Sequence, residues 1–183
     1  LLTRELAQLF KHVYAFEPML SNCVVLAQNI LSNDLSDLVT VEPCALSDAN
    51  GTGTLYLSSR EIGSSCHALN RKVNFRGQAD EFVASQSCEF ARLDTLIDVG
   101  EVTVPTRIKI DVDGFEPAVV RGIGKYFPSV RSMIVEVNPA LEAHRFMVSG
   151  LGDEGFRFDP AQVKHSTRKC GPFVGVAEYL FYR

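Results

Sequence analysis

Charged side chains alternate with apolar ones in the segment Arg107–Glu116, which reads Arg-Ile-Lys-Ile-Asp-Val-Asp-Gly-Phe-Glu. In an extended strand Lys109, Asp111 and Asp113 lie on one face, and the apolar residues between them lie on the other. Strands buried in a parallel sheet are almost continuously apolar, so one face of this strand is kept polar. Ligands of open α/β sheets bind outside the carboxyl ends of the strands. The segment therefore predicts binding or catalytic carboxylates at the end of a strand.

Two acidic residues in this half of the chain are candidates for chemistry, and each has a structural alternative. Lys109 lies two residues before Asp111 on the same face, so an ion pair would keep that carboxylate ionised, either for a site or as a plain salt bridge. Glu136 interrupts the apolar strand expected at Met133–Val137, where a carboxylate needs a partner or water. A site role and a buried pair with an arginine explain Glu136 equally well.

A third acidic residue, Glu17, directly follows a short apolar strand, Val13–Phe16, and precedes Pro18. Proline disfavours the α conformation for Glu17, which places it at a strand-to-helix turn. In nucleotide-binding α/β folds an acidic residue in such a place accepts hydrogen bonds from both ribose hydroxyls. The alternative is a helix cap that satisfies backbone N–H groups. The residues alone leave both interpretations open.

A magnesium site is a weaker possibility, because Asp111, Asp113, Glu116 and Glu136 could together offer carboxylate oxygens. Glu116 is equally explained by the preference for acids in the first turn of a helix. The histidines show no metal-ligand spacing, and Cys66-His67 has no second pair. We therefore predict no metal site.

Strands and helices are expected to alternate along the chain. A helix at the amino terminus would feed the strand at 13–16. Further strands are expected at residues 38–42, 54–58, 82–85, 88–92, 107–113 and 132–137, and helices at residues 18–32, 94–99, 116–126 and 139–148. The Ser59–Ala79 segment is predicted to be a long loop that could act as a lid. Gly155–Asp159 and Val174–Tyr182 are expected to pair as an antiparallel hairpin.

This order predicts an α/β fold with a mostly parallel sheet, right-handed crossovers and the hairpin at one edge. The 183 residues, 46% of them hydrophobic, suffice for one core, so a single domain over 1–183 is expected. A net charge of −4, from 18 basic and 22 acidic residues, argues against nucleic acid as a partner. No apolar run approaches the roughly 20 residues of a membrane span. Five widely spaced cysteines suit free thiols in the cytoplasm.

Six segments occur in the order found in one family of enzymes. They are Tyr14-Ala-Phe-Glu-Pro18, Ala45-Leu-Ser-Asp48 followed by Gly51, Gly63-Ser-Ser65, Arg92-Leu-Asp94, Lys109-Ile-Asp-Val-Asp-Gly-Phe-Glu116 and Val135-Glu-Val137. Together they resemble the motifs of FkbM-type methyltransferases, from about Val13 to Asn138. The resemblance implies a class I, Rossmann-like fold and S-adenosylmethionine as the cofactor.

The resemblance also implies roles for single residues on the cofactor side. Glu17 would hold the ribose, and the turn containing Ala45, Leu46 and Asp48 would lie near the adenine. Asp111 would face the methyl donor or the acceptor. Such enzymes also carry a first strand and a glycine-rich turn that this sequence lacks, so we expect the chain to be an amino-terminally incomplete version of a longer enzyme.

On the acceptor side, Ser64 and Ser65 of the lid, together with Lys109 and Asp113, are the predicted substrate contacts. The family usually has glutamate where this chain has Asp113, which moves that carboxylate back by about one methylene. A larger residue, Phe115, also stands where a small one is common, which would narrow that part of the pocket.

The expected reaction is O-methylation of a small metabolite, a sugar or a polyketide, in which Asp111 or Glu136 accepts or orients the acceptor hydroxyl. Two other classes fit the same residues. A nicotinamide-dependent oxidoreductase would also use an acid such as Glu17, and a non-catalytic binding module could keep the fold without the cofactor turn. The identity of the acceptor and the oligomeric state are left open.

Overall fold

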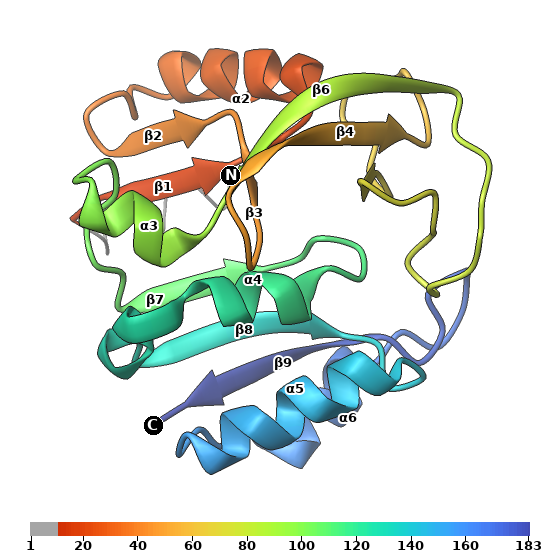
Figure 1. Ribbon diagram of the computed structural model, residues 1–183. Helices are drawn as coiled ribbons and strands as arrows, with labels where there is room; N and C mark the ends of the chain where they lie inside the picture. The colour runs from red at the N-terminus through yellow and green to blue at the C-terminus, as the bar shows by residue number, and fades with distance from the viewer. Residues whose placement is uncertain (1–10) are drawn as a thin grey trace.

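The computed structural model describes residues 11–183 as an arrangement of strands and helices (Figure 1). The strands are β1 (Val13–Phe16), β2 (Val39–Glu42), β3 (Ala45–Leu46), β4 (Gly51–Leu57), β5 (Ala68–Leu69), β6 (Ala84–Ala91), β7 (Arg107–Ile110), β8 (Ser132–Val137) and β9 (Ala177–Tyr182). The helices are α2 (Leu20–Ser32), α3 (Leu93–Asp98), α4 (Glu116–Gly122), the 3-10 helix η1 (Gly124–Ser129), α5 (Glu142–Asp153) and α6 (Pro160–Ser166). The helix predicted at the amino terminus lies outside the described residues.

The α/β class is confirmed, but the prediction of a mostly parallel sheet is wrong. β1 pairs with β2, β3 with β6 and β7 with β8 in parallel, whereas β4 pairs with both β5 and β6, and β9 with β8, in antiparallel register. The reason lies between β4 and β6, where the chain returns through the lid without a crossover helix. Without a helical crossover the returning strand runs antiparallel.

The carboxyl-terminal edge differs from the predicted hairpin in its pairing. β9 is antiparallel as expected, but its partner is β8, and Arg157 forms a single bridge to Tyr182. Residues 155–159 cannot extend as a strand because α6 begins at Pro160, and the Asp159 side chain accepts a hydrogen bond from the Ala161 N–H, 2.8 Å away.

Two predicted elements are shorter than expected because the backbone turns at residues with positive φ. β7 ends at Ile110 rather than at Asp113, since Asp113 and Gly114 have φ of 53° and 105°. The helix expected over 116–126 is divided at Gly124, where φ is 52°. Conversely, the two strand pieces predicted at 82–85 and 88–92 form one continuous strand, β6.

The largest hydrophobic cluster packs β7, β8 and β9 against α4 and α5, and includes Ile110, Val135 and Phe181, all nearly inaccessible to solvent. Tyr14 and Phe16 of β1 pack against this same cluster. Within residues 11–183, β1 pairs only with β2 and β7 only with β8, so each has an edge without a strand partner. None of the described helices is long and apolar enough to cross a membrane.

Gly122 brings α4 against the backbone that follows β3. A Cβ atom at Gly122 would lie 2.0 Å from the carbonyl oxygen of Ser47. We predict that Gly122→Ala lowers the free energy of unfolding by about 1–3 kcal/mol, the usual cost of overpacking.

Gly150, inside α5, is the matched control, because a Cβ atom there meets nothing within 4 Å. Gly150→Ala is expected to raise the free energy of unfolding by roughly 0.5–1 kcal/mol, since alanine favours a helix interior. Urea denaturation of both variants measures the difference. Equal effects of the two substitutions would contradict the close packing of α4.

Candidate functional site

The loop between β7 and α4, which carries Asp111 and Asp113, is held by the buried side chain of Glu116. This side chain has no exposed surface. Its Oε1 accepts a hydrogen bond from the Val112 N–H at 2.9 Å, and its Oε2 accepts one from the Gly114 N–H at 3.0 Å. A carboxylate with two backbone donors satisfies a turn that would otherwise leave those donors unpaired in the interior. Glu116 therefore fixes the shape of the loop.

His144 of α5 lies beside Glu116, and its side chain is 2% exposed. Its Nδ1 accepts a hydrogen bond from the Asn138 N–H at 3.1 Å, which leaves the proton of a neutral ring on Nε2. That nitrogen lies 3.3 Å from Glu116 Oε2. The contact is not aligned well enough to count as a hydrogen bond, so we regard it as a weak electrostatic one.

Burial sets the charge state of this pair. It raises the pKa of Glu116 to about 7, although the hydrogen bonds from the backbone oppose the shift. Burial also lowers the pKa of His144, so the imidazole is neutral at pH 7. The Glu116–His144 pair is therefore a buried polar contact that connects the end of β7 to the end of β8.

Asp113 connects the loop after β7 to the lid. One of its carboxylate oxygens accepts a hydrogen bond from the Cys66 N–H at 2.6 Å. Next to it, a Cβ atom on Gly114 would lie 3.5 Å from the Phe75 Cα, so the lid backbone rests directly on this loop. Asp113, predicted as a substrate contact, is thus occupied by the lid.

Asp111 and Lys109 form the ion pair that their spacing predicts, which confirms that contact. Lys109 Nζ lies 3.2 Å from Asp111 Oδ2 and 3.5 Å from Glu178 Oε1. Partial burial lowers the pKa of Lys109, but the hydrogen bond to Asp111 and the nearby negative charges outweigh it and raise the pKa overall. The Asp111 side chain is 38% exposed, so it remains accessible to a ligand.

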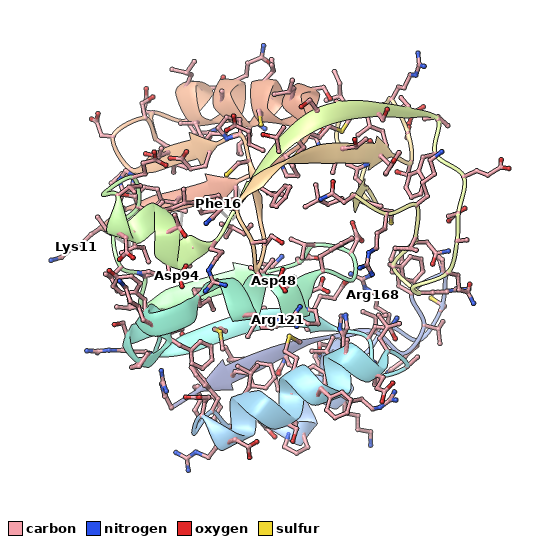
Figure 2. All side chains as sticks on the ribbon, viewed as in Figure 1. Lys11, Phe16, Asp48, Asp94, Arg121 and Arg168 are labelled. Atoms are coloured by element: carbon pink, nitrogen blue, oxygen red, sulfur yellow. The ribbon has the colours of Figure 1, made fainter. Side chains whose placement is uncertain are left out.

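Glu136 is buried and is paired with an arginine, as expected if it forms a buried ion pair. Arg168, from the segment after α6, forms an ion pair with Glu136, with 2.7 Å between Nη2 and Oε1; Figure 2 labels this arginine. The pKa of Glu136 is raised, first by burial and then by the negative charge of Asp111, and Arg168 opposes this only in part. The charge coupling indicates that Glu136 and Asp111 occupy one region.

Glu17 lies directly after β1, and its carboxylate binds the backbone N–H of Met19, the residue that precedes α2. Its Oε1 accepts a hydrogen bond from the Met19 N–H at 2.8 Å, and its Oε2 lies 3.4 Å from Asn22 Nδ2. The capping interpretation therefore describes a contact that exists. A carboxylate has about four acceptor positions, so these contacts leave room for further donors.

The lid joins the Glu17 region to the Asp113 region. Asn22 donates from Nδ2 to the Ser64 carbonyl at 3.2 Å and accepts from the Gly63 N–H at 2.7 Å. Two residues further on, Cys66 binds Asp113. Ser64 turns its hydroxyl back to the Glu61 carbonyl at 2.7 Å, whereas Ser65 is exposed. Of the predicted substrate contacts, Ser65 thus remains accessible and Ser64 is engaged within the lid.

The turn predicted at Ala45–Asp48 is wrong in its first half. Ala45 and Leu46 form β3, because they pair in parallel with Phe90 and Ala91 of β6. Asp48 follows this strand and accepts two hydrogen bonds from Arg121 of α4 through one oxygen, at 2.7 and 2.9 Å. These bonds lower the pKa of Asp48.

Figure 2 shows Asp48, Arg121 and Asp94 gathered beside α3 and α4, apart from Arg168. Among residues 11–183, no hydrogen bond or ion pair joins Asp48 to Glu17 or Asp111. Its position near a bound adenine stays a prediction.

Several residues that hold the site together could not be identified from the sequence: Asn22, Cys66, Asn138, His144 and Arg168. Their contacts are long-range, and their surroundings in the sequence give no signal. The sequence suggested Glu116 only as a first-turn acid or a magnesium ligand, although its position two residues after Gly114 could have indicated that it closes the turn. Within the part of the chain that the structure describes, no three His, Cys, Asp or Glu side chains gather as metal ligands.

Known proteins resemble this chain both in sequence and in fold. A sequence model of the FkbM methyltransferase domain matches residues 3–158. The crystal structure of the methyltransferase FkbM from Methylobacillus flagellatus KT is similar, with a TM-score of 0.57 and 14% sequence identity. The match covers 95% of this chain and 37% of that chain, so this chain spans well under half the length of its structural neighbour. At this identity the likeness shows the fold alone. None of the curated proteins compared matches the chain.

The raised pKa of Glu116 predicts a pH dependence of stability. Because its folded-state pKa lies near 7 and its ordinary value is 4.5, the folded state holds the proton more tightly than the unfolded state. The contribution of Glu116 to stability is therefore complete below pH 4.5 and is lost as pH rises through 7. Relative to Glu116→Gln, the wild type should lose on the order of 3 kcal/mol of unfolding free energy across this range.

Chemical denaturation at pH values from 5 to 8 measures this difference. The control is Glu142→Gln, which removes an exposed acid from the first turn of α5. Its difference from the wild type should change little with pH. A difference between wild type and Glu116→Gln that stays constant over the range would show that Glu116 has an ordinary pKa.

Proposed function

The chain belongs to the FkbM methyltransferase domain family, and on this premise we propose that it methylates a hydroxyl group of a small metabolite with S-adenosylmethionine as the donor. One observation carries the proposal beyond family membership. Glu17 and Asp111 each follow the end of a parallel-paired strand, and the lid joins their surroundings through Asn22 and Cys66. Such an edge is where α/β folds bind ligands.

The residues present suit the ribose part of the cofactor. Glu17 is partly exposed, and its contacts to the Met19 N–H and Asn22 do not exhaust its acceptor positions. The main-chain bond from Met19 also fixes the orientation of the carboxylate, which lowers the cost of ordering it on binding. Glu17 would therefore accept hydrogen bonds from the two ribose hydroxyls, whose spacing suits the two oxygens of a carboxylate.

Methyl transfer requires the protein to align the methyl donor with the acceptor hydroxyl and to accept one proton. When bound, S-adenosylmethionine supplies a methyl carbon on a positively charged sulfur, whose C–S bond breaks as the acceptor oxygen bonds that carbon. Asp111 is accessible and forms an ion pair with Lys109, so it would orient the acceptor hydroxyl and accept its proton. Glu136 is engaged by Arg168, and its proposed part is to hold negative charge beside Asp111.

Calorimetric titration with S-adenosylhomocysteine tests the proposal. We expect saturable binding, weakened by roughly 1.5–3 kcal/mol in Glu17→Gln, because a charge-assisted hydrogen bond is lost. Glutamine keeps one carbonyl oxygen for the Met19 N–H, so the hydrogen bond at the start of α2 survives the substitution. The control is Glu89→Gln on the exposed side of β6, which should bind as the wild type does. Folded protein that binds no S-adenosylhomocysteine would contradict the proposed function.

A further inference from the structure

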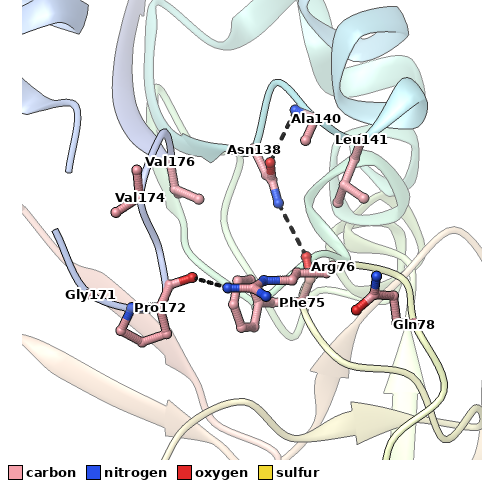
Figure 3. A pocket seen from close by; sticks show the side chains of 10 residues that line it. All are labelled: Phe75, Arg76, Gln78, Asn138, Ala140, Leu141, Gly171, Pro172, Val174 and Val176. Carbon is pink, nitrogen blue, oxygen red and sulfur yellow. Dashed lines mark hydrogen bonds between the residues drawn. The ribbon is translucent and has the colours of Figure 1, made fainter. Parts of the chain in front are cut away.

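A cavity of about 310 Å³ lies where three segments of the chain meet (Figure 3). The lid contributes Phe75, Arg76 and Gln78, and the segment after β8 contributes Asn138, Ala140 and Leu141. The third side is closed by residues before β9: Gly171, Pro172, Val174 and Val176. Its volume is at the small end of the range for pockets that bind small molecules. None of the site residues predicted from the sequence lines it.

The cavity shares a wall with the carboxylate region. Asn138, at its rim, donates its backbone N–H to His144, whose other nitrogen lies against Glu116. The Asn138 side chain donates to the Phe75 carbonyl at 3.4 Å, and the Phe75 backbone packs on Gly114. A molecule in the cavity would therefore adjoin the loop that carries Asp111.

The walls are held in place by contacts between the lid and the carboxyl-terminal segment. Arg76 donates to the Pro172 carbonyl at 2.6 Å, and the rings of Phe75 and Phe173 lie 4.2 Å apart between centroids. The guanidinium of Arg168, bound to Glu136, lies 4.9 Å from the centroid of Phe173. The cavity is thus formed before any ligand enters, which reduces the ordering cost of binding.

The lining has one charged group, Arg76, and no carboxylate. Arg76 is exposed, and no acidic side chain among residues 11–183 pairs with it. A guanidinium is always charged and has five N–H donors, and the bond to Pro172 uses one of them. The side chain of Gln78 adds a neutral donor and acceptor, and Leu141, Val174 and Val176 supply apolar surface.

From this lining we propose that the cavity is the methyl-acceptor site and takes a small hydroxylated anion of about monosaccharide size, with its carboxylate or phosphate on Arg76. The inference rests on the proposed function and adds the class of acceptor. Arg76 binds the anionic group as a planar donor, Gln78 meets hydroxyl groups, and the apolar side chains cover the carbon framework. Arg76 thereby determines specificity, without contact to the transferred methyl group.

Binding of three probes tests the inference: D-glucuronate, D-glucose 6-phosphate and D-glucose. We expect the wild type to bind at least one of the two anions at least tenfold more tightly than glucose. The two anions distinguish a carboxylate from a phosphate. Arg76→Gln should reduce binding of that anion to the level of glucose, whereas Arg71→Gln, an exposed arginine of the lid that does not line the cavity, should leave it unchanged.

The inference is overturned if neither anion binds better than glucose, or if Arg76→Gln binds the anions as the wild type does. Titration of the same samples with S-adenosylhomocysteine separates this result from the proposed function. Cofactor binding without anion preference would leave the methyltransferase proposal standing and remove the acceptor class. Anion binding without cofactor binding would leave an anion site in the cavity, but it would contradict the methyltransferase proposal and with it the role of methyl-acceptor site.

Discussion

The candidate site depends on the burial of one carboxylate, Glu116. A buried carboxylate must be matched by donors, and here the donors are two backbone N–H groups of the preceding loop, with the imidazole of His144 beside them. The backbone hydrogen bonds that satisfy Glu116 therefore also fix the shape of the loop that carries Asp111. His144, which contacts Glu116, also accepts a hydrogen bond from the Asn138 N–H, so buried polar contacts hold the ends of β7 and β8 together.

The lid completes the site by touching both ends of it. Near α2 its backbone is bound by Asn22, and near α4 the Cys66 N–H is bound by Asp113. Farther along, Phe75 meets both Asn138 and Phe173. A loop anchored at several separate points has a defined shape although its only strand is the two-residue β5, which explains how a segment with little periodicity can form one wall of a pocket.

The motifs that resemble the methyltransferase family have two physical roles in this chain. Arg92 binds Asp94 through two hydrogen bonds, at 2.9 and 2.6 Å, and donates to the Asp48 carbonyl, while Asp48 itself binds Arg121. This group connects α3 and α4 to the segment after β3, and Figure 2 shows it apart from Arg168. The motifs at Glu17 and Asp111 instead place carboxylates at accessible strand ends. The order of the motifs along the sequence does not show which motifs form structural ion pairs and which form a ligand site.

The sequence by itself determined the α/β class, most of the strands, the Lys109–Asp111 ion pair and the family, because these follow from local periodicity, spacing and order. It did not determine the direction of β4 and β6, the strand at Ala45–Leu46 or the partner of β9, since strand pairing is chosen by long-range hydrogen bonds. Likewise, the sequence suggested an arginine as the partner of Glu136 but did not identify it as Arg168. Only the tertiary structure decided which polar groups meet, because a buried charge takes whichever partner the fold brings within reach, however distant that partner is in the sequence.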